Sequence, residues 1–232
     1  MEHLVALRRD LHAHPELGFQ EQRTSDIVAN FLQQLGIEVH RGIGKTGVVG
    51  ILKKGGSERM IGLRADMDAL PMLDQSGTDW QSRVEQVSHA CGHDGHTVML
   101  LGAAEKLARD VSFDGSVCFI FQPAEEGLAG AKAMIDDGLF SRFPCEAVYA
   151  IHNWPELPLG QVQTSPGAIM AAADRFDIRV LGGGGHAAQP HLTRDTLLAT
   201  SELVVQLNTL VSRALDPCET ALLTVTRMQG GF

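Results

Sequence analysis

The densest group of reactive side chains lies in one eight-residue segment, His89-Ala90-Cys91-Gly92-His93-Asp94-Gly95-His96. Thiolates and neutral imidazoles are the ordinary ligands of zinc and its neighbours, and the two glycines let the backbone bend. We therefore expect Cys91 and His93 to face one metal ion, with Asp94 orienting a ligand. The alternative is a buried structural cysteine beside a capping Asp94, which three histidines in so short a stretch disfavour.

Two adjacent carboxylates follow a second apolar run. The segment Gln122-Pro123-Ala124-Glu125-Glu126-Gly127 comes where an expected strand, 117–122, ends. Open α/β sheets place their sites at the carboxyl ends of strands. One glutamate can bind a metal while the other takes a proton from an attacking water. An acidic helix start, favourable to the helix dipole, is the alternative explanation of this pair.

A histidine and two aspartates extend the same pattern. His152 ends the expected strand 147–152, while Asp66 and Asp68 follow the expected strand 60–64. A single histidine there is more often structural, but Cys, His, Glu and His at three successive strand or loop ends match one or two divalent ions. The aspartates are expected either to orient the metal ligands or to be simple turn residues. Such donors accept zinc, manganese, cobalt or nickel.

A glycine run, Gly182 to Gly185, precedes His186. Glycines let the backbone approach a ligand closely, but the Gly-Lys-Ser/Thr ending of a phosphate loop is absent. His186 could donate a hydrogen bond to a developing oxyanion. Without that context, a loop histidine would be assigned no role.

Alternating helices and strands must position these groups. Apolar spacing predicts helices up to Leu11 and over 24–35, 97–109 and 129–137, together with strands over 47–52, 60–64, 117–122 and 147–152. This alternation predicts an α/β fold with a largely parallel sheet and helices on both faces.

A separate β-α-β unit is predicted near the end of the chain. It comprises a strand over 175–181, a helix over 194–215 and a strand over 221–228. Two strands and one helix bury too little surface to be stable alone. We therefore expect a second, unfinished domain and a truncated or fragmentary chain.

Charge and composition narrow the class of protein. The 19 basic and 28 acidic residues give a net charge of -9, which disfavours nucleic acid and anionic membranes as partners. We expect no bilayer-spanning or signal segment, and hence a cytoplasmic protein. The four cysteines are far apart and do not indicate a disulfide scaffold.

Taken together, the motifs resemble the aminoacylase and carboxypeptidase type of dinuclear metallopeptidase. Within that family they are most similar to the branch of hippurate hydrolases, indole-acetyl-amino-acid hydrolases and N-acyl-amino-acid amidohydrolases. The resemblance runs the whole length and rests on the segments 8–12, 14–16, 63–71, 89–96, 122–127, 151–155 and 184–191.

This resemblance implies a zinc-aminopeptidase-like catalytic domain over 1–170 and part of a lid or dimerisation domain over 171–232. It implies two metal ions bridged by a water or hydroxide, and hydrolysis of the amide bond of a small N-acyl amino acid. It also implies a homodimer formed through the lid. The implied metal ligands are Cys91, His93, Glu126 and His152, with Glu125 as general base and His186 stabilising the tetrahedral intermediate.

One departure from the family defines the alternative function. Family members are longer and supply a further metal-binding histidine near their C-terminus, which is absent from this sequence. The alternative is therefore a truncated, catalytically inactive metal-binding relative or fragment. A structural zinc protein ranks third, because it needs a closed four-ligand site without a free glutamate such as Glu125.

Overall fold

The computed structural model describes residues 1–109 and 111–231. These form two compact units, Met1–Val162 and Gln163–Phe232, which are described separately. The predicted division of roles between 1–170 and 171–232 stays a prediction. Within the described residues, every helix is too short or too polar to cross a bilayer.

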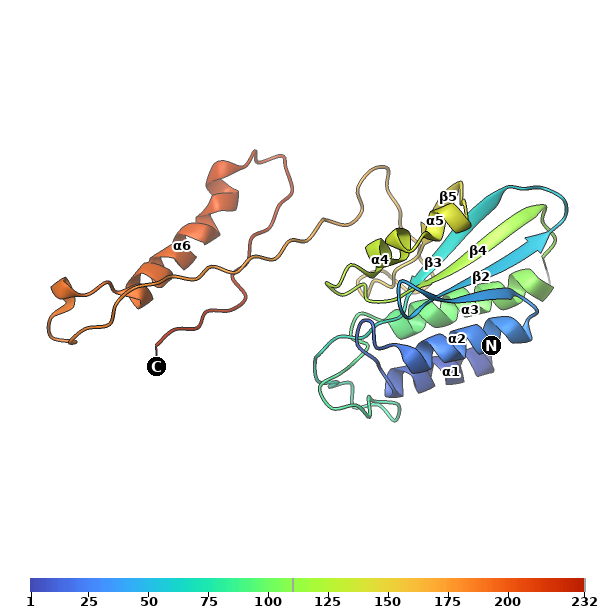
Figure 1. Ribbon diagram of the computed structural model, residues 1–232, viewed down its shortest axis with the longest axis horizontal. Helices are drawn as coiled ribbons and strands as arrows, with labels where there is room; N and C mark the ends of the chain where they lie inside the picture. The colour runs from blue at the N-terminus through green and yellow to red at the C-terminus, as the bar shows by residue number, and fades with distance from the viewer. Residues whose placement is uncertain (110, 232) are drawn as a thin grey trace. The chain divides into compact units, whose positions relative to one another are not determined.

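A five-stranded sheet forms the centre of the first unit (Figure 1). The strand order is β1 (Glu38–Ile43), β2 (Gly47–Lys54), β4 (Gly115–Gln122), β3 (Met60–Asp66) and β5 (Ala147–Ala150). Strand β3 pairs in parallel with β4 and with β5, whereas β2 pairs antiparallel with both β1 and β4. Four strands therefore run in one direction and β2 alone is reversed, which confirms the predicted α/β fold with a largely parallel sheet.

Helices cover both faces of this sheet. Three lie on one face: α1 (Glu2–Ala13), α2 (Gln22–Gln34) and α3 (His93–Arg109). The short helices α4 (Gly130–Asp136) and α5 (Leu139–Arg142) pack on the other. The predicted helices 24–35, 97–109 and 129–137 correspond to α2, α3 and α4, although α3 begins four residues early, at His93.

The central strand β4 shows why the layers form. Its side chains alternate, so Phe119 and Phe121 join the core beneath α2 and α3, while Cys118 and Ile120 join the core beneath α4 and α5. All eight β4 residues are buried. Burying each phenylalanine contributes about 1.5–3 kcal/mol. Pairing of Asp66 with Gln122 then brings the carboxyl ends of β3 and β4 level at one edge.

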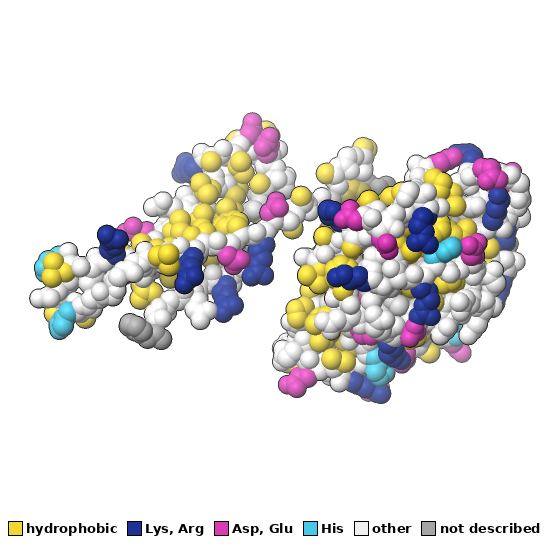
Figure 2. Space-filling view, viewed as in Figure 1, with side chains coloured by type: hydrophobic (Ala, Val, Ile, Leu, Met, Phe, Trp, Pro, Cys, Tyr) yellow, Lys and Arg dark blue, Asp and Glu magenta, His cyan; other side chains and the backbone are white. Residues whose placement is uncertain are grey.

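The second unit differs from its prediction. The helix expected over 194–215 is present as α6 (Thr196–Ala214), with Asp195 accepting hydrogen bonds from its first-turn amides. Besides α6, the described part of this unit holds only the short 3-10 helix Pro190–Leu192. The strands predicted over 175–181 and 221–228 do not form. Two strands without further partners are marginal, which explains their absence. No residue of α6 is buried, and Figure 2 shows hydrophobic side chains exposed on this unit.

Candidate metal centre

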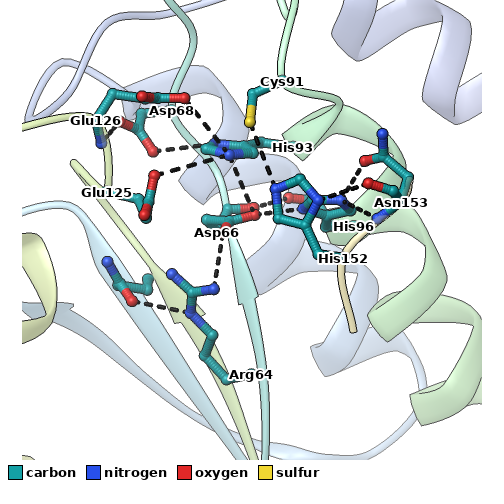
Figure 3. Close-up of polar contacts among 12 residues, drawn as sticks. Arg64, Asp66, Asp68, Cys91, His93, His96, Glu125, Glu126, His152 and Asn153 are labelled. Atoms are coloured by element: carbon teal, nitrogen blue, oxygen red, sulfur yellow. Dashed lines mark hydrogen bonds and ion pairs between the residues drawn. The ribbon is translucent and has the colours of Figure 1, made fainter. Parts of the chain in front are cut away.

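The four predicted metal ligands and the predicted general base come together at the carboxyl edge of the sheet (Figure 3): Cys91, His93, Glu126, His152 and Glu125. They come from the loop before α3, the first turn of α3, the β4–α4 turn and the exit of β5. Their donor atoms form overlapping groups, each within 4.8 Å, that share His93. The groups are Cys91, His93 and His152; His93, Glu125 and Glu126; and a third, Asp66, His93 and His96.

His93 lies at the middle of this cluster and is fully buried. Its Nδ1 is 3.3 Å from Asp68 Oδ1, so the ring proton is held there by a carboxylate. Its Nε2 lacks a hydrogen-bond partner among the described residues and lies 3.8 Å from Glu126 Oε1. A buried nitrogen with a free lone pair requires a partner, and a metal ion fits that requirement.

Cys91 and His152 form the opposite side of the cluster. The Cys91 Sγ lies 3.4 Å from His152 Nε2. His152 Nδ1 donates to the Asn153 carbonyl at 2.6 Å, which leaves the Nε2 lone pair directed toward the thiol. Both histidines therefore present Nε2 to the same space.

The negative charge of the carboxylates around Cys91 also favours binding of a cation. Burial raises the pKa of the Cys91 thiol to about 12, and the carboxylates of Glu126, Asp66 and Glu125 act in the same direction. A divalent ion reverses this balance, because a coordinating thiol loses its proton. The donor set therefore fits a bound divalent metal better than it fits a cavity without one.

Asp68 connects two of the candidate ligands. Besides its contact with His93, its Oδ2 accepts the Glu126 backbone N–H at 2.9 Å. Burial raises the pKa of Asp68, but the hydrogen bonds from His93 and from the Glu126 and Glu125 amides outweigh that effect and lower it. An ionised Asp68 thus fixes both the imidazole orientation and the position of the glutamate pair.

Asp66 supports the loop that carries His152, and it does so through His96. His96 was not among the predicted site residues. His96 Nδ1 donates to Asp66 Oδ1 at 2.7 Å, and His96 Nε2 accepts the Asn153 backbone N–H at 3.0 Å. Arg64 also pairs with Asp66 at 2.8 Å. This buried chain of contacts holds the residue next to His152. The third histidine of the 89–96 segment was the available sequence signal.

Asp94 faces away from the cluster. Its Oδ2 is 2.8 Å from His12 Nδ1 and 2.7 Å from Arg8 Nε, both on α1. These contacts fix the first turn of α3, which carries His93. The expected effect of Asp94 on a metal ligand stays a prediction, and it would run through the backbone of that turn.

Glu125 differs from its neighbour in having a freer carboxylate. The side chain is 42% exposed, with Oε2 4.0 Å from His93 Nε2. Partial burial raises its pKa, and the negative charge of Glu126 adds to the shift. A carboxylate with a raised pKa beside a metal site has the properties of a general base.

His186 belongs to the second unit and is exposed. Its Nδ1 accepts the Ala188 backbone N–H at 3.1 Å, so the neutral ring carries its proton on Nε2. That nitrogen is available as a donor.

The sequence of this chain is similar to those of known hydrolases and deacetylases. The family model described as "Peptidase family M20/M25/M40" matches residues 62–226 of this chain. Hippurate hydrolase of Campylobacter jejuni subsp. jejuni is 48% identical and aligns with 97% of this chain and 58% of its own length. N-acetyldiaminopimelate deacetylase of Oceanobacillus iheyensis is 42% identical, with 100% of this chain and 62% of its own length aligned.

A solved structure shows the same fold. The Bacillus subtilis YXEP protein, described as a dinuclear metal binding peptidase from the M20 family, is 41% identical with a TM-score of 0.65. The match covers 68% of this chain and 45% of that one. The present chain thus spans less than two thirds of the length of each of these relatives.

Proposed function

The chain belongs to peptidase family M20/M25/M40, and from that premise we propose that it carries the centre of a metal-dependent amidohydrolase acting on small N-acyl amino acids. The observation that supports this most directly is the convergence of Cys91, His93, Glu126 and His152 around one space beside the freer carboxylate of Glu125. The names of two relatives, hippurate hydrolase and N-acetyldiaminopimelate deacetylase, favour an acyl amino acid as substrate.

The proposed ligand set holds two divalent ions, of zinc, manganese, cobalt or nickel. Cys91, His93, Glu126 and His152 supply the donor atoms. When bound, such ions polarise the substrate carbonyl and make a water more acidic. Asp68 and Asp66 keep the donors in place, Asp68 through His93 and Asp66 through His96 and the backbone next to His152.

Glu125 carries the proton in the proposed reaction. It accepts a proton from the attacking water and then delivers that proton to the nitrogen of the leaving amine. Its raised pKa suits both steps, because the carboxylate must hold the proton between them. His186 is proposed to donate from Nε2 to the oxygen that gains negative charge as the carbonyl becomes tetrahedral. A homodimer formed through the second unit remains part of the proposal.

The test combines metal analysis with hydrolysis of N-benzoyl and N-acetyl amino acids. We expect two ions per chain in the parent protein and in Glu125→Gln, with kcat reduced about 10²–10⁴-fold in that variant. Glu126→Gln should lose metal. Glu146→Gln is the matched control, since Glu146 pairs with Arg59 on the surface.

Two results would contradict the proposal: hydrolysis that resists a chelator, or Glu125→Gln with undiminished turnover. Bound metal without turnover in any form would instead favour the catalytically inactive metal-binding relative.

A further inference from the structure

A fully buried glutamate, Glu21, lies at the start of α2 and is 0% exposed. Its Oε2 accepts the Thr46 hydroxyl at 2.6 Å, and its Oε1 accepts the backbone N–H of Ala124 at 2.8 Å. Ala124 directly precedes the Glu125-Glu126 pair. One side chain thus connects α2, the β1–β2 turn and the β4–α4 turn.

Helix capping does not account for this buried carboxylate. Glu21 occupies the N-cap position of α2 but makes no side-chain hydrogen bond to the helix. Glu16 performs that task instead, accepting the backbone N–H groups of Arg23 and Thr24 at 2.9 and 2.8 Å. Burying a carboxylate is costly. The presence of Glu21 at this buried position, bonded to Thr46 and Ala124, therefore requires a reason other than helix capping.

The partners of Glu21 are themselves held in place. The Ser25 hydroxyl donates to the carbonyl of Thr46. Ala124 is fully buried, has a left-handed φ of 49°, and accepts the Gly130 N–H at 2.9 Å through its carbonyl. A non-glycine residue keeps such a φ only where its surroundings impose it, and the Glu21 bond to its amide is one such constraint.

The glutamate pair is therefore held between two carboxylates. Glu21 binds the amide of Ala124, just before the pair, and Asp68 binds the amide of Glu126 itself. We propose that Glu21 is a positioning residue of the metal centre, which fixes the direction of Glu125 and Glu126 by holding the Ala124 amide. This inference rests on the proposed function for its effect on catalysis.

The experiment compares Glu21→Gln and Glu21→Leu in the full chain. Glutamine keeps a carbonyl oxygen that can accept from the Ala124 amide. Its side-chain nitrogen can donate to the Thr46 hydroxyl, because a hydroxyl accepts hydrogen bonds as well as donating them. Leucine has a similar size and removes the acceptor. Glu16→Leu is the matched control, because it removes a carboxylate bound to backbone amides at the same end of α2 but not to the β4–α4 turn. Glu21→Asp, one methylene shorter, replaces the leucine variant should that one fail to fold.

Three measurements separate positioning from general stability. The first is hydrogen exchange of the Ala124 amide in metal-free protein. The second is the visible spectrum of the Co²⁺-loaded protein, which reports ligand geometry. The third is kcat and KM for N-acyl amino acid hydrolysis. In Glu21→Leu we expect faster exchange at Ala124, an altered Co²⁺ spectrum and kcat lowered about 10–100-fold, with KM little changed. Glu21→Gln should restore all three, and Glu16→Leu should alter none of them.

Unchanged Ala124 exchange, Co²⁺ spectrum and kcat in folded Glu21→Leu or Glu21→Asp would overturn the inference. So would equal effects in Glu16→Leu. Absence of hydrolysis in the parent protein would count against the proposed function alone, because the exchange and Co²⁺ measurements still decide whether Glu21 holds the turn.

Discussion

At the level of single residues, the centre is organised by hydrogen bonds that fix which ring nitrogen faces inward. His93 and His152 each use Nδ1 on an oxygen of the surrounding chain, so both present Nε2. His96 is arranged differently, because both of its nitrogens are occupied, by Asp66 and by the Asn153 amide. We therefore interpret His96 as a support for the loop of His152, although its position also places it in a candidate ligand group.

Gly92 provides a test at this scale. It separates Cys91 from His93, has a φ of 88°, and would direct an added Cβ into the side chain of Asn153. Gly92→Ala should therefore displace both candidate ligands and lower metal affinity about 10-fold or more, by analogy with changes next to metal ligands. Titration with Co²⁺ measures the affinity. Gly95→Ala is the control, since a Cβ there meets open space; equal affinities in the two variants would contradict the prediction.

The sequence identified the site residues that stand next to one another or at the ends of apolar runs. Cys91 and His93 are recognisable by their spacing, and Glu125 by its neighbour. Glu21 was not recognisable, because its partner is a backbone amide 103 positions away, and no residue type marks such a partner. His96 was visible as part of a cluster, but its partners Asp66 and Asn153 become apparent only when the strands are paired.

At the level of secondary structure, α3 carries much of the centre and is secured at both ends. Its first turn contacts α1 through Asp94. Near its last turn, Lys54 Nζ on β2 donates to the carbonyls of Leu107 and Ala108 at 2.7 and 3.0 Å, and also to Val111. A cation at the C-terminal end of a helix is favoured by the helix dipole.

Lys54→Met should therefore destabilise the first unit by about 1–3 kcal/mol, since the hydrogen bonds from a charged donor to these carbonyls are lost. Lys53→Met, which removes an exposed pair with Glu58, should cost less than about 1 kcal/mol. Both tryptophans, Trp80 and Trp154, lie in the first unit, so urea unfolding followed by their fluorescence measures the difference. Similar losses in the two variants would be evidence against the role of Lys54.

The start of α2 should make stability depend on pH. Burial raises the pKa of Glu21 above its ordinary value of 4.5, although hydrogen bonds from Thr46 and Ala124 oppose the shift. A raised folded-state pKa means that Glu21 contributes most stability below pH 4.5 and loses that contribution as the pH rises through its folded-state pKa. Relative to Glu21→Gln, the metal-free parent protein should become less stable over that range. Urea unfolding of both proteins at several pH values is the measurement, and a pH-independent difference would refute the prediction.

Among the strands, one that is uniformly buried was readily predicted, whereas one at an exposed edge of the sheet was missed. All of β4 is buried, and its residues Val117 to Phe121 are apolar on both faces, which makes the strand recognisable. In contrast, β1 (Glu38–Ile43) was missed, because Glu38, His40 and Arg41 interrupt its pattern at an exposed edge. The strands expected over 175–181 and 221–228 have suitable alternation, but a strand also requires partners, which alternation alone does not provide.

At the level of the whole molecule, every candidate metal ligand lies in Met1–Val162 and His186 lies in the other unit. Because His186 and the candidate ligands lie in different units, a substitution of His186 should affect turnover without affecting metal binding. His186→Ala should leave the metal content and Co²⁺ spectrum unchanged while lowering kcat about 10²–10³-fold, as removal of an oxyanion donor does. His191→Ala, also exposed and in the second unit, serves as the control. Loss of metal in His186→Ala, or unaltered kcat, would contradict the assignment.

The two outer strands of the sheet have opposite surface character. On β1, Glu38 and Arg41 are charged and exposed, and charge at a sheet edge discourages unwanted strand pairing. On β5, Val148 and Tyr149 are 44% and 59% exposed and no charge lies in the strand. Aggregation of the isolated chain by strand addition is therefore expected to begin at β5, next to His152. Val148→Lys would place a charge at that edge, at a position that is not itself a candidate ligand.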